Sequence, residues 1–156
     1  MSRLRIVAVG HKMPSWVQQG FAEYSKRMPR EFAVELRELA PVHRGRNADT
    51  GRAMQQEGDA VLAALSGDDY VVALEVKGKM WSTEELAAFL QQQLDRGQRI
   101  NFLIGGADGL SPACRDRAQR QWSLSALTLP HPLVRVMLME QLYRAWSILA
   151  SHPYHR

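Results

Sequence analysis

Two runs of apolar residues end in small residues that can hold a ligand through backbone contacts. Ile100–Ile104 has the pattern of a buried strand and leads directly into Gly105 and Gly106, where a backbone without side chains can approach a bound molecule closely. Trp122–Leu129 is a second run, interrupted by Ser and Thr, and the Pro-His-Pro sequence at 130–132 cannot continue a strand. Because open parallel sheets bind ligands at the carboxyl ends of their strands, we expect the binding site at these two strand ends.

Strands and helices alternate along the whole chain, and this order determines how the two runs are placed. Short β-branched or alternating runs predict strands, whereas apolar residues at helical spacing, preceded by Ser or Pro, predict helices. The predicted strands are Arg3–Val9, Phe32–Leu39, Asp68–Val76, Ile100–Ile104 and Trp122–Leu129. The predicted helices are Ser15–Arg27, Thr50–Leu65, Thr83–Asp95, Pro112–Gln121 and Leu133–Ala150. This order predicts one α/β domain over residues 1–156, with a mostly parallel sheet flanked by helices.

Three local patterns add detail to this scheme. Phe32–Leu39 alternates apolar and polar residues, which indicates a strand near the edge of the sheet. Lys77–Lys79 has a central glycine and is expected to form a turn after the third strand. Ser82 and Glu85 have the spacing of a capping box at the start of a helix.

The composition bounds the class of protein. With 156 residues, 46% of them hydrophobic and 23% charged, the chain is long enough for one globular core. A formal net charge of +4 favours an anionic partner without identifying it. The single cysteine, Cys114, cannot form an intrachain disulfide, the first ten residues lack the apolar run of a signal peptide, and no run is as long as a membrane span. We therefore expect a cytoplasmic protein that does not contact a membrane.

Several common catalytic motifs are absent from the sequence. It contains no phosphate-binding loop of the form G-x-x-x-x-G-K-[ST], and the glycines at 105, 106 and 109 do not match the dinucleotide fingerprint G-x-G-x-x-G. No serine stands in G-x-S-x-G, and Cys114 lies in a predicted helix without an obvious base. Pro153 prevents a regular helix from presenting His152 and His155 to a metal ion, so we expect no metal site.

Two basic segments are candidates for binding RNA. In the sequence HRGRN, Arg44 and Arg46 flank a glycine; this segment is either a solvated loop or an arm that follows the phosphates of a nucleic acid. The C-terminal sequence HPYHR is either a frayed terminus or a tail in which Tyr154 or His155 stacks on a base and Arg156 contacts a phosphate. Both interpretations of each segment stay open at this point.

The last predicted helix, Leu133–Ala150, is apolar over most of its circumference. Its polar side chains share a narrow sector that includes Glu140 and Arg144, which are spaced to form an ion pair. The apolar surface is wider than one face of a sheet needs. We therefore expect a second copy of the chain to cover part of it, in an isologous homodimer.

Four segments of the chain together resemble one family of enzymes. They are KMPSWVQQGFAEYSKR at 12–27, RGRNAD at 44–49, LIGGADGLSPAC at 103–114 and the C-terminal block that begins at Trp122. The chain is similar over essentially its full length to the bacterial methyltransferases of the SPOUT (α/β-knot) superfamily that modify a pseudouridine in large-subunit rRNA. It departs from them at Ala107 and Asp108, where Pro-Glu is common, and many relatives carry one more acidic residue beyond Arg156.

The resemblance implies an activity, a cofactor and a knotted fold. The activity is methylation of N3 of a pseudouridine in 23S rRNA, expected on the assembled ribosome and not on DNA, and the methyl donor is S-adenosylmethionine. The C-terminal segment would thread through an earlier loop in a trefoil knot, although threaded chains are rare. The family's cofactor pocket corresponds to eight residues of this chain: Leu74, Gly105, Leu124, Ser125, Ala126, Leu127, Thr128 and Leu129.

The resemblance also suggests which residues act on the substrate, since the enzyme has to orient the nucleotide and help N3 to lose its proton. The candidates for orientation or proton removal are His131, Tyr154 and His155. The candidates for binding the substrate or its phosphates are Arg44, Arg46, Arg135, Arg156 and Lys12. Because SPOUT enzymes of this kind build the site from both protomers, the tail of one chain is expected to complete the pocket of the other.

Two other classes of protein match parts of the sequence. A non-catalytic ribosome-binding factor would share the basic arm and the dimer but would not need an apolar cofactor pocket. Binding of S-adenosylmethionine, measured by calorimetry, separates this class from a methyltransferase. A flavodoxin-like nucleotide enzyme would share the sheet but should have a phosphate-binding loop after its first strand, where Gly10, His11 and Lys12 form a poor one.

Overall fold

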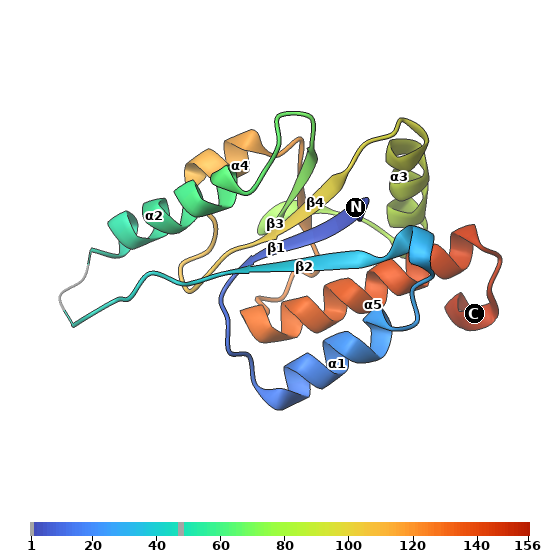
Figure 1. Ribbon diagram of the computed structural model, residues 1–156, viewed down its shortest axis with the longest axis horizontal. Helices are drawn as coiled ribbons and strands as arrows, with labels where there is room; N and C mark the ends of the chain where they lie inside the picture. Colours follow the sequence, from blue (N-terminus) through green and yellow to red (C-terminus); the bar gives the residue numbers. More distant parts are fainter. Residues whose placement is uncertain (1, 47–48) are drawn as a thin grey trace.

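The computed structural model describes residues 2–46 and 49–156 and contains a five-stranded sheet with helices on both faces (Figure 1). The strands are β1 (Leu4–Val9), β2 (Val34–Leu39), β3 (Tyr70–Met80), β4 (Ile100–Ile104) and β5 (Arg120–Ser123). Their order across the sheet is β2-β1-β4-β3-β5, and every neighbouring pair is parallel. The predicted α/β architecture with a parallel sheet is therefore confirmed.

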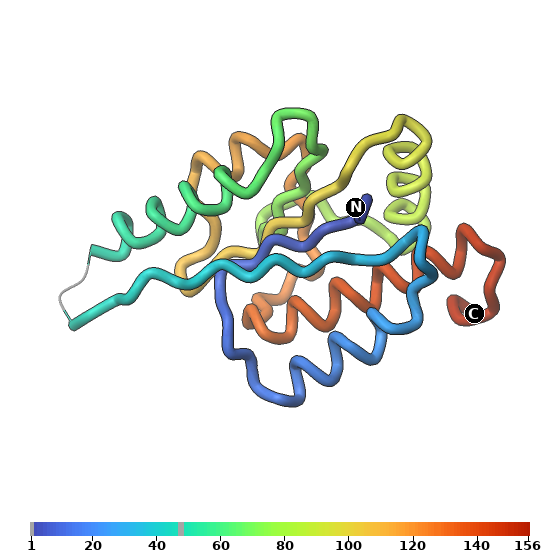
Figure 2. The backbone as a smooth tube through the Cα atoms, in the orientation of Figure 1, coloured from blue at the N-terminus to red at the C-terminus, as the bar shows by residue number. Residues whose placement is uncertain are grey.

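The helices form a layer on each face of this sheet. In the described part of the chain they are α1 (Ser15–Ser25), α2 (Thr50–Ala63), α3 (Thr83–Asp95), α4 (Pro112–Arg117) and α5 (His131–Leu149), with short 3-10 helices η1 (Arg30–Phe32) and η2 (Pro153–His155). In Figures 1 and 2, α2 and α4 lie on one side of the sheet and α1 and α5 on the other. The apolar residues of α3 share one core cluster with those of α5. Both faces of the sheet are thus covered.

The two central strands are buried on both faces, as parallel strands between helical layers must be. All residues of β1 and β4 are buried. One layer of their side chains packs toward α3 and α5, and the other packs toward α2 and α4. Strand β2 instead alternates between half-buried and exposed residues, and its position at the edge of the sheet confirms the prediction for this segment.

The fifth strand begins earlier and is shorter than predicted. It covers Arg120–Ser123, and the prediction that it continues to Leu129 is wrong. The Ser123 hydroxyl donates to the carbonyl oxygen of Ser125 at 2.7 Å, and the Ser125 hydroxyl accepts a hydrogen bond from the backbone of Leu127 at 2.9 Å. These side chains satisfy backbone groups locally and so compete with a continued strand ladder. The segment after β5 is irregular as a result.

The third strand is longer than predicted, because it continues through Gly78 to Met80 where the sequence predicts a turn. Its pairing with β5 shifts register between Leu74 and Lys79. A side chain at Gly78 would lie 2.7 Å from backbone atoms of Gln121, so the glycine permits a close approach of two strands rather than a turn.

Several helix boundaries also differ from the predictions. Helices α1 and α2 each end two residues earlier than predicted, at Ser25 and Ala63. Helix α4 ends at Arg117 and does not reach Gln121, because the chain enters β5 at Arg120. Helix α5 begins at His131, two residues before the predicted start, with Pro132 in its first turn. The predicted capping box at the start of α3 is confirmed.

Two negative findings apply to residues 2–46 and 49–156. Within these ranges, no helix has both the length and the apolar character needed to cross a membrane. The same residues include no group of three or more His, Cys, Asp or Glu side chains placed to hold a metal ion.

Candidate functional site

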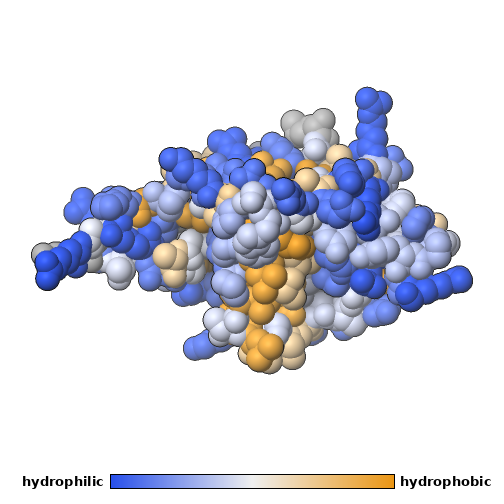
Figure 3. Space-filling view, turned by 90° about the horizontal axis from the view of Figure 1, so that it is seen from below, coloured by the Kyte–Doolittle hydropathy of each residue, from blue (hydrophilic) through white to orange (hydrophobic). Residues whose placement is uncertain are grey.

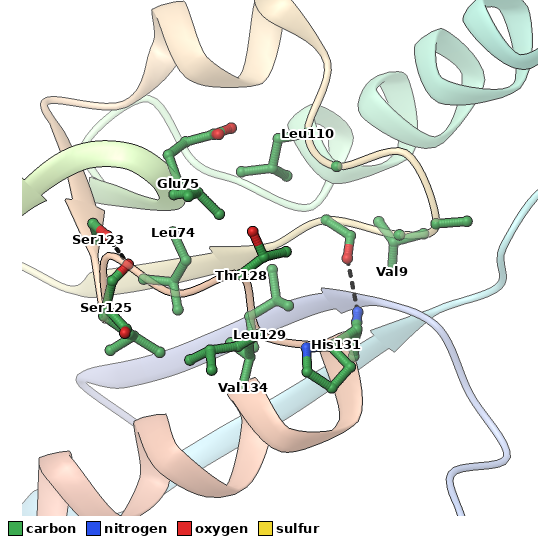
Figure 4. Close-up of a pocket in the computed structure, with 18 of the residues that line it drawn as sticks. Val9, Leu74, Glu75, Leu110, Ser123, Ser125, Thr128, Leu129, His131 and Val134 are labelled. Atoms are coloured by element: carbon green, nitrogen blue, oxygen red, sulfur yellow. Dashed lines mark hydrogen bonds between the residues drawn. The ribbon is translucent and has the colours of Figure 1, made fainter.

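A cavity of about 780 Å³ lies at the carboxyl ends of β1, β4 and β5 and beside the middle of β3, at Leu74, Glu75 and Val76 (Figure 4). Its wall also includes the loop after β4 and the irregular segment before α5. Most of the wall is apolar, and its members include Val9, Leu74, Ile104, Leu110, Leu129 and Val134, with Glu75, Ser125, Thr128 and His131 among the polar ones. The volume is within the range of small-molecule sites. The cavity therefore lies where a parallel sheet binds its ligand.

Most of the residues predicted to hold the cofactor line this cavity. They are Leu74, Gly105, Leu124, Ser125, Leu127, Thr128 and Leu129. Ala126 is the exception, because it is exposed and does not contribute to the wall. Contact between these residues and a cofactor stays a prediction.

The loop after β4 is a tight turn that requires glycine. A Cβ atom at Gly105 would overlap the backbone of Gly109 and lie 2.5 Å from the backbone nitrogen of Leu110. Gly109 itself has a φ of +84°, in the left-handed region that favours glycine. An isolated bridge between Gly106 and Gly109 closes the turn. The loop consequently presents backbone rather than large side chains to the cavity.

His131 lies in the cavity wall with both ring nitrogens engaged. Nδ1 is 2.7 Å from the carbonyl oxygen of Gly105, and Nε2 is 2.8 Å from Nε of Arg135. Because a guanidinium can only donate, Nε2 must accept, and the ring proton therefore sits on Nδ1 and is donated to Gly105. The imidazole ties the start of α5 to the loop after β4. Removal of a substrate proton by His131 would require one of these bonds to break.

Arg135 lies beneath the cavity rather than on an open surface. Its side chain is 2% exposed and forms an ion pair with Glu38, with Nη1 and Oε2 2.5 Å apart. Nη2 donates to the carbonyl oxygen of Gly10 at 2.8 Å. The predicted role of Arg135 in binding substrate charge does not agree with this burial. The guanidinium instead joins α5, β2 and the end of β1.

Acidification is expected to destabilise the protein through His131. Burial lowers the pKa of His131, and the charge of Arg135 acts in the same direction. The native state therefore favours the neutral ring, so this contribution to stability is present above the unfolded pKa of about 6.5 and is lost as the pH falls toward the native pKa. Urea unfolding from about pH 8 to about pH 5 measures the loss.

His131→Gln should lose part of that pH dependence, because the titrating group is gone. His11→Gln, a change at an exposed histidine, is the matched control and should retain it. If the free energy of unfolding had the same pH slope in His131→Gln as in the unchanged protein, the assignment of the neutral ring would be wrong.

Arg44 was predicted to contact phosphates, but the structure engages it in an internal network. Its guanidinium binds both carboxylate oxygens of Glu57, at 2.8 and 2.9 Å, and Nε binds Asp108 at 2.7 Å. Glu57 is buried, and these hydrogen bonds lower the pKa of its carboxyl group. Since Asp108 belongs to the loop after β4, Arg44 links the segment before α2 to the wall of the cavity. Arg46 is exposed, and the next residues of the RGRNAD motif, 47 and 48, lie outside the described residues.

Arg44→Ala is expected to lower the free energy of unfolding by about 3 kcal/mol, because the buried carboxylate of Glu57 loses its partner. Arg46→Ala removes the same kind of side chain from an exposed position two residues away and should change stability by less than about 0.5 kcal/mol. Urea unfolding at neutral pH compares the two variants. Equal stabilities would show that the network does not support the fold.

The predicted tail residues lie far from the cavity of their own chain. Tyr154 packs on Tyr143, with ring centroids 4.5 Å apart, and under the guanidinium of Arg144 at 4.9 Å. His155 Nδ1 is 3.2 Å from the hydroxyl of Ser147. These partners belong to the last turns of α5, whereas the cavity lies at its first turn. The tail ends with Arg156 exposed.

Three carboxylates at or beside the site were not identified from the sequence. Glu38 binds Arg135, Glu57 binds Arg44, and Glu75 lines the cavity. The available signal was an acidic residue within a largely apolar strand, as in the DDYVVALEV run that holds Glu75. The ion pairs could not be predicted, because Glu38 and Arg135 are 97 residues apart.

Comparison with known proteins shows to which family the chain belongs. A family model described as "Predicted SPOUT methyltransferase" matches residues 2–155. The chain belongs to the SPOUT methyltransferase family. Two relatives in Hahella chejuensis and Chromohalobacter salexigens, each described as "Ribosomal RNA large subunit methyltransferase H", are 56% identical over 154 residues, which cover 99% of this chain and 99% of each relative. A relative in Methylococcus capsulatus with the same description is 55% identical over 154 residues, again 99% of both chains.

Solved structures of low sequence identity share the SPOUT fold. A "Probable Methyltransferase" from Bordetella pertussis has a TM-score of 0.60 and 20% identity, covering 92% of this chain and 94% of that one. A "probable methylase family protein" from Haemophilus influenzae has a TM-score of 0.60 and 12% identity, covering 99% of this chain and 71% of that one. At these identities the likeness concerns the fold alone.

The residues of the cavity fit S-adenosylmethionine, the cofactor of SPOUT methyltransferases. An adenosyl group is bound well by apolar side chains with free backbone groups beside them. The segment 124–129 lies outside the sheet ladder and lines the cavity together with Leu74 and Gly105. Its backbone groups that are not bonded to the hydroxyls of Ser123 and Ser125 are therefore available for such contacts. These residues would hold the cofactor.

Proposed function

We propose that this protein methylates N3 of a pseudouridine in 23S rRNA, with S-adenosylmethionine as the methyl donor. The observation that carries the proposal is the 55–56% identity, over 99% of the chain, to relatives described as ribosomal RNA large subunit methyltransferase H. The cavity supports it physically, because it is mostly apolar, has the volume of a small-molecule site and contains most of the residues that the family resemblance assigns to the cofactor.

The chain has to hold the acceptor nitrogen in line with the methyl group and assist the loss of its proton, while the cofactor supplies the methyl group itself. Both ring nitrogens of His131 are hydrogen-bonded, one to Gly105 and one to Arg135, so we propose that His131 stabilises the cavity wall. Tyr154 and His155 therefore remain the candidates for orientation or proton removal.

Tyr154 and His155 would have to act in the cavity of a second copy of the chain. Tyr143, which contacts Tyr154, lies 12 residues after His131 on α5, or about 18 Å along the helix. Figure 2 shows the chain turning back after α5 at the end of that helix remote from its start. We therefore propose that the tail of one protomer completes the cavity of its partner.

The surface around the cavity supports such a dimer. Val76, Met80 and Leu127 are 51%, 59% and 72% exposed, and Val76 and Leu127 also line the cavity. On the face seen from below in Figure 3, the side on which α1 and α5 lie, a band of hydrophobic residues runs from the middle of the view to its lower edge. Apolar surface of this kind marks interfaces. Sedimentation at micromolar concentration tests the proposal, and a monomer would contradict it.

Contact with the ribosome would use the basic side chains that remain exposed. Lys12, Arg46 and Arg156 are exposed, whereas Arg44 and Arg135 are held in ion pairs. Exposed cations bind phosphates without reading a sequence, so we propose that the protein recognises the shape of an assembled ribosomal surface. That substrate would place the protein in the cytoplasm.

Mass spectrometry of rRNA tests the function directly. Ribosomes from cells that lack the activity are incubated with the protein and S-adenosylmethionine carrying a labelled methyl group, and naked 23S rRNA is treated in parallel. We expect one labelled methyl on a pseudouridine of the ribosomal sample and much less on naked rRNA. A non-catalytic ribosome-binding factor would associate with the ribosomes and leave both samples unlabelled.

Two architectural predictions stay proposals. The trefoil knot follows from the resemblance to SPOUT enzymes, and it is supported by the position of the segment 124–131 against the loop after β4. The single domain over residues 1–156 is supported by a sheet that draws strands from most of the chain. Cooperative unfolding followed by two independent probes would test the second.

A further inference from the structure

Glu75 places an acidic side chain in the wall of a largely apolar cavity, next to Leu74 on β3. Successive strand residues point to opposite faces of a sheet, and Figure 4 shows Glu75 on the side of Leu110, away from Leu74. Its oxygen Oε1 is buried and has no hydrogen-bond partner. Among the described residues, only Asn101 and Trp122 also have a buried side-chain atom without such a partner.

Arg115 does not satisfy this carboxylate oxygen. Its Nη1 atom lies 3.8 Å from Oε1 of Glu75, which is an ion-pair distance but too long for a hydrogen bond. The same Nη1 atom donates to the carbonyl oxygen of Leu110 at 3.3 Å. Arg115 therefore compensates the charge of Glu75 and leaves the lone pairs of Oε1 without a hydrogen bond.

A buried carboxylate oxygen without a hydrogen bond destabilises the folded chain. Burial also raises the pKa of Glu75, and the Arg115 charge offsets only part of that effect. Such a group is uncommon in a folded protein and calls for an explanation. A ligand in the cavity would provide one if a rotation of the Glu75 side chain brought this oxygen to the cavity surface, where the ligand could donate the missing hydrogen bond.

The donor is expected to be a neutral group of the cofactor. S-adenosylmethionine carries two cationic groups, the sulfonium and the ammonium, and three neutral donors, the two ribose hydroxyls and the adenine amino group. With the guanidinium of Arg115 already 3.8 Å from Oε1, the charge of Glu75 is partly compensated, and a second cation would gain less from it than from an unpaired carboxylate. The adenine edge is suited to the backbone of the segment 124–129. The hydroxyls remain, and a carboxylate can accept from two neighbouring hydroxyls at once.

We propose that Glu75 binds the ribose of the cofactor by accepting hydrogen bonds from its 2′ and 3′ hydroxyls. The inference rests on the assignment of the cavity to S-adenosylmethionine. Arg115 is then a positioning residue, which keeps the Glu75 carboxylate ionised and directed into the cavity.

Calorimetry with S-adenosylhomocysteine tests the proposal, because this probe has the same ribose, lacks the sulfonium and is not consumed. The full-length protein is titrated with S-adenosylhomocysteine and with its 2′,3′-dideoxy analogue. The same titrations are made on Glu75→Gln, which keeps the shape of the side chain, and on Glu84→Gln, a matched change at an exposed glutamate. Thermal unfolding of each ligand-free variant is recorded in parallel.

Glu75→Gln is expected to weaken binding of S-adenosylhomocysteine by about 10- to 100-fold, the effect of losing a hydrogen bond to a charged group. It should change binding of the dideoxy analogue by less than about 3-fold, because that ligand has no hydroxyl to lose. Glu84→Gln should alter neither. The ligand-free Glu75→Gln variant should melt at the same or a higher temperature, whereas a purely structural ion pair would give a lower one.

The possible results separate the failure of each assumption. If the unchanged protein bound no S-adenosylhomocysteine, the assignment of the cavity would fall, and the ribose contact with it. Suppose that the unchanged protein binds S-adenosylhomocysteine. If Glu75→Gln then bound S-adenosylhomocysteine equally well, or if its affinities for S-adenosylhomocysteine and for the dideoxy analogue fell by the same factor, the ribose contact alone would be wrong. If Glu75→Gln did not fold, the titrations of the unchanged protein would still test the ribose contact. Equal affinities of the unchanged protein for S-adenosylhomocysteine and its dideoxy analogue would contradict it.

Discussion

Deleting residues 154–156 is expected to abolish rRNA methylation while leaving the affinity for S-adenosylmethionine within about twofold of the full-length value. The cavity lies at the start of α5 and the tail packs on its last turns, so the deletion removes no residue from the cofactor cavity of the same chain. Rates on ribosomes and calorimetric binding of the cofactor measure the two effects. Thermal unfolding is needed as a control, because Tyr154 also packs on Tyr143.

Mixing two inactive variants tests whether the tail acts on the partner subunit. One protomer lacks the tail, and the other carries Gly105→Ala in the cavity. In a mixed dimer the intact cavity of the first would receive the intact tail of the second. With random pairing half of the dimers are mixed and each has one competent site, so about a quarter of the full activity should return. A tail that served its own cavity would restore none, and that outcome would contradict the proposal.

Gly105→Ala is expected to weaken binding of the cofactor by at least about 100-fold and to lower the free energy of unfolding by about 2 kcal/mol. The added Cβ atom would overlap the backbone of Gly109 and lie 2.5 Å from Leu110 N, so the loop after β4 has to open. Opening it would also displace the Gly105 carbonyl that accepts from His131. Calorimetry and urea unfolding measure the two losses.

Gly67→Ala is the matched control for this substitution. A Cβ atom at Gly67 would meet nothing within 4 Å, so the change should leave both the affinity and the stability close to their original values. If Gly105→Ala behaved like Gly67→Ala, the loop after β4 would be flexible enough to accept a side chain, and its role in shaping the cavity would have to be abandoned.

The predictions that were confirmed depend on residues close together in the chain. The alternation of strands and helices, the capping box at Ser82 and the edge position of β2 each follow from spacing within a few residues. The glycines after β4 were predictable for the same reason, because the backbone conformation of a tight turn depends on the residues of the turn itself. The length of β5 was predicted wrongly because the mostly apolar sequence of Trp122–Leu129 was interpreted as a strand. The serine hydroxyls in this segment instead form hydrogen bonds with the local backbone.

The sequence by itself was sufficient to predict a parallel α/β sheet with small residues at the ends of its strands, because these features depend on patterns among neighbouring residues. Only the tertiary structure decided which charges meet. Arg135 and Arg44, expected to face the substrate, are drawn into ion pairs with Glu38 and Glu57, and Glu75 is brought into a cavity wall without a hydrogen bond for Oε1. The reason is physical, since such contacts depend on the order of strands and on how helices pack across them. These bring together residues as far apart in the chain as Gly10 and Arg135, which are 125 positions apart.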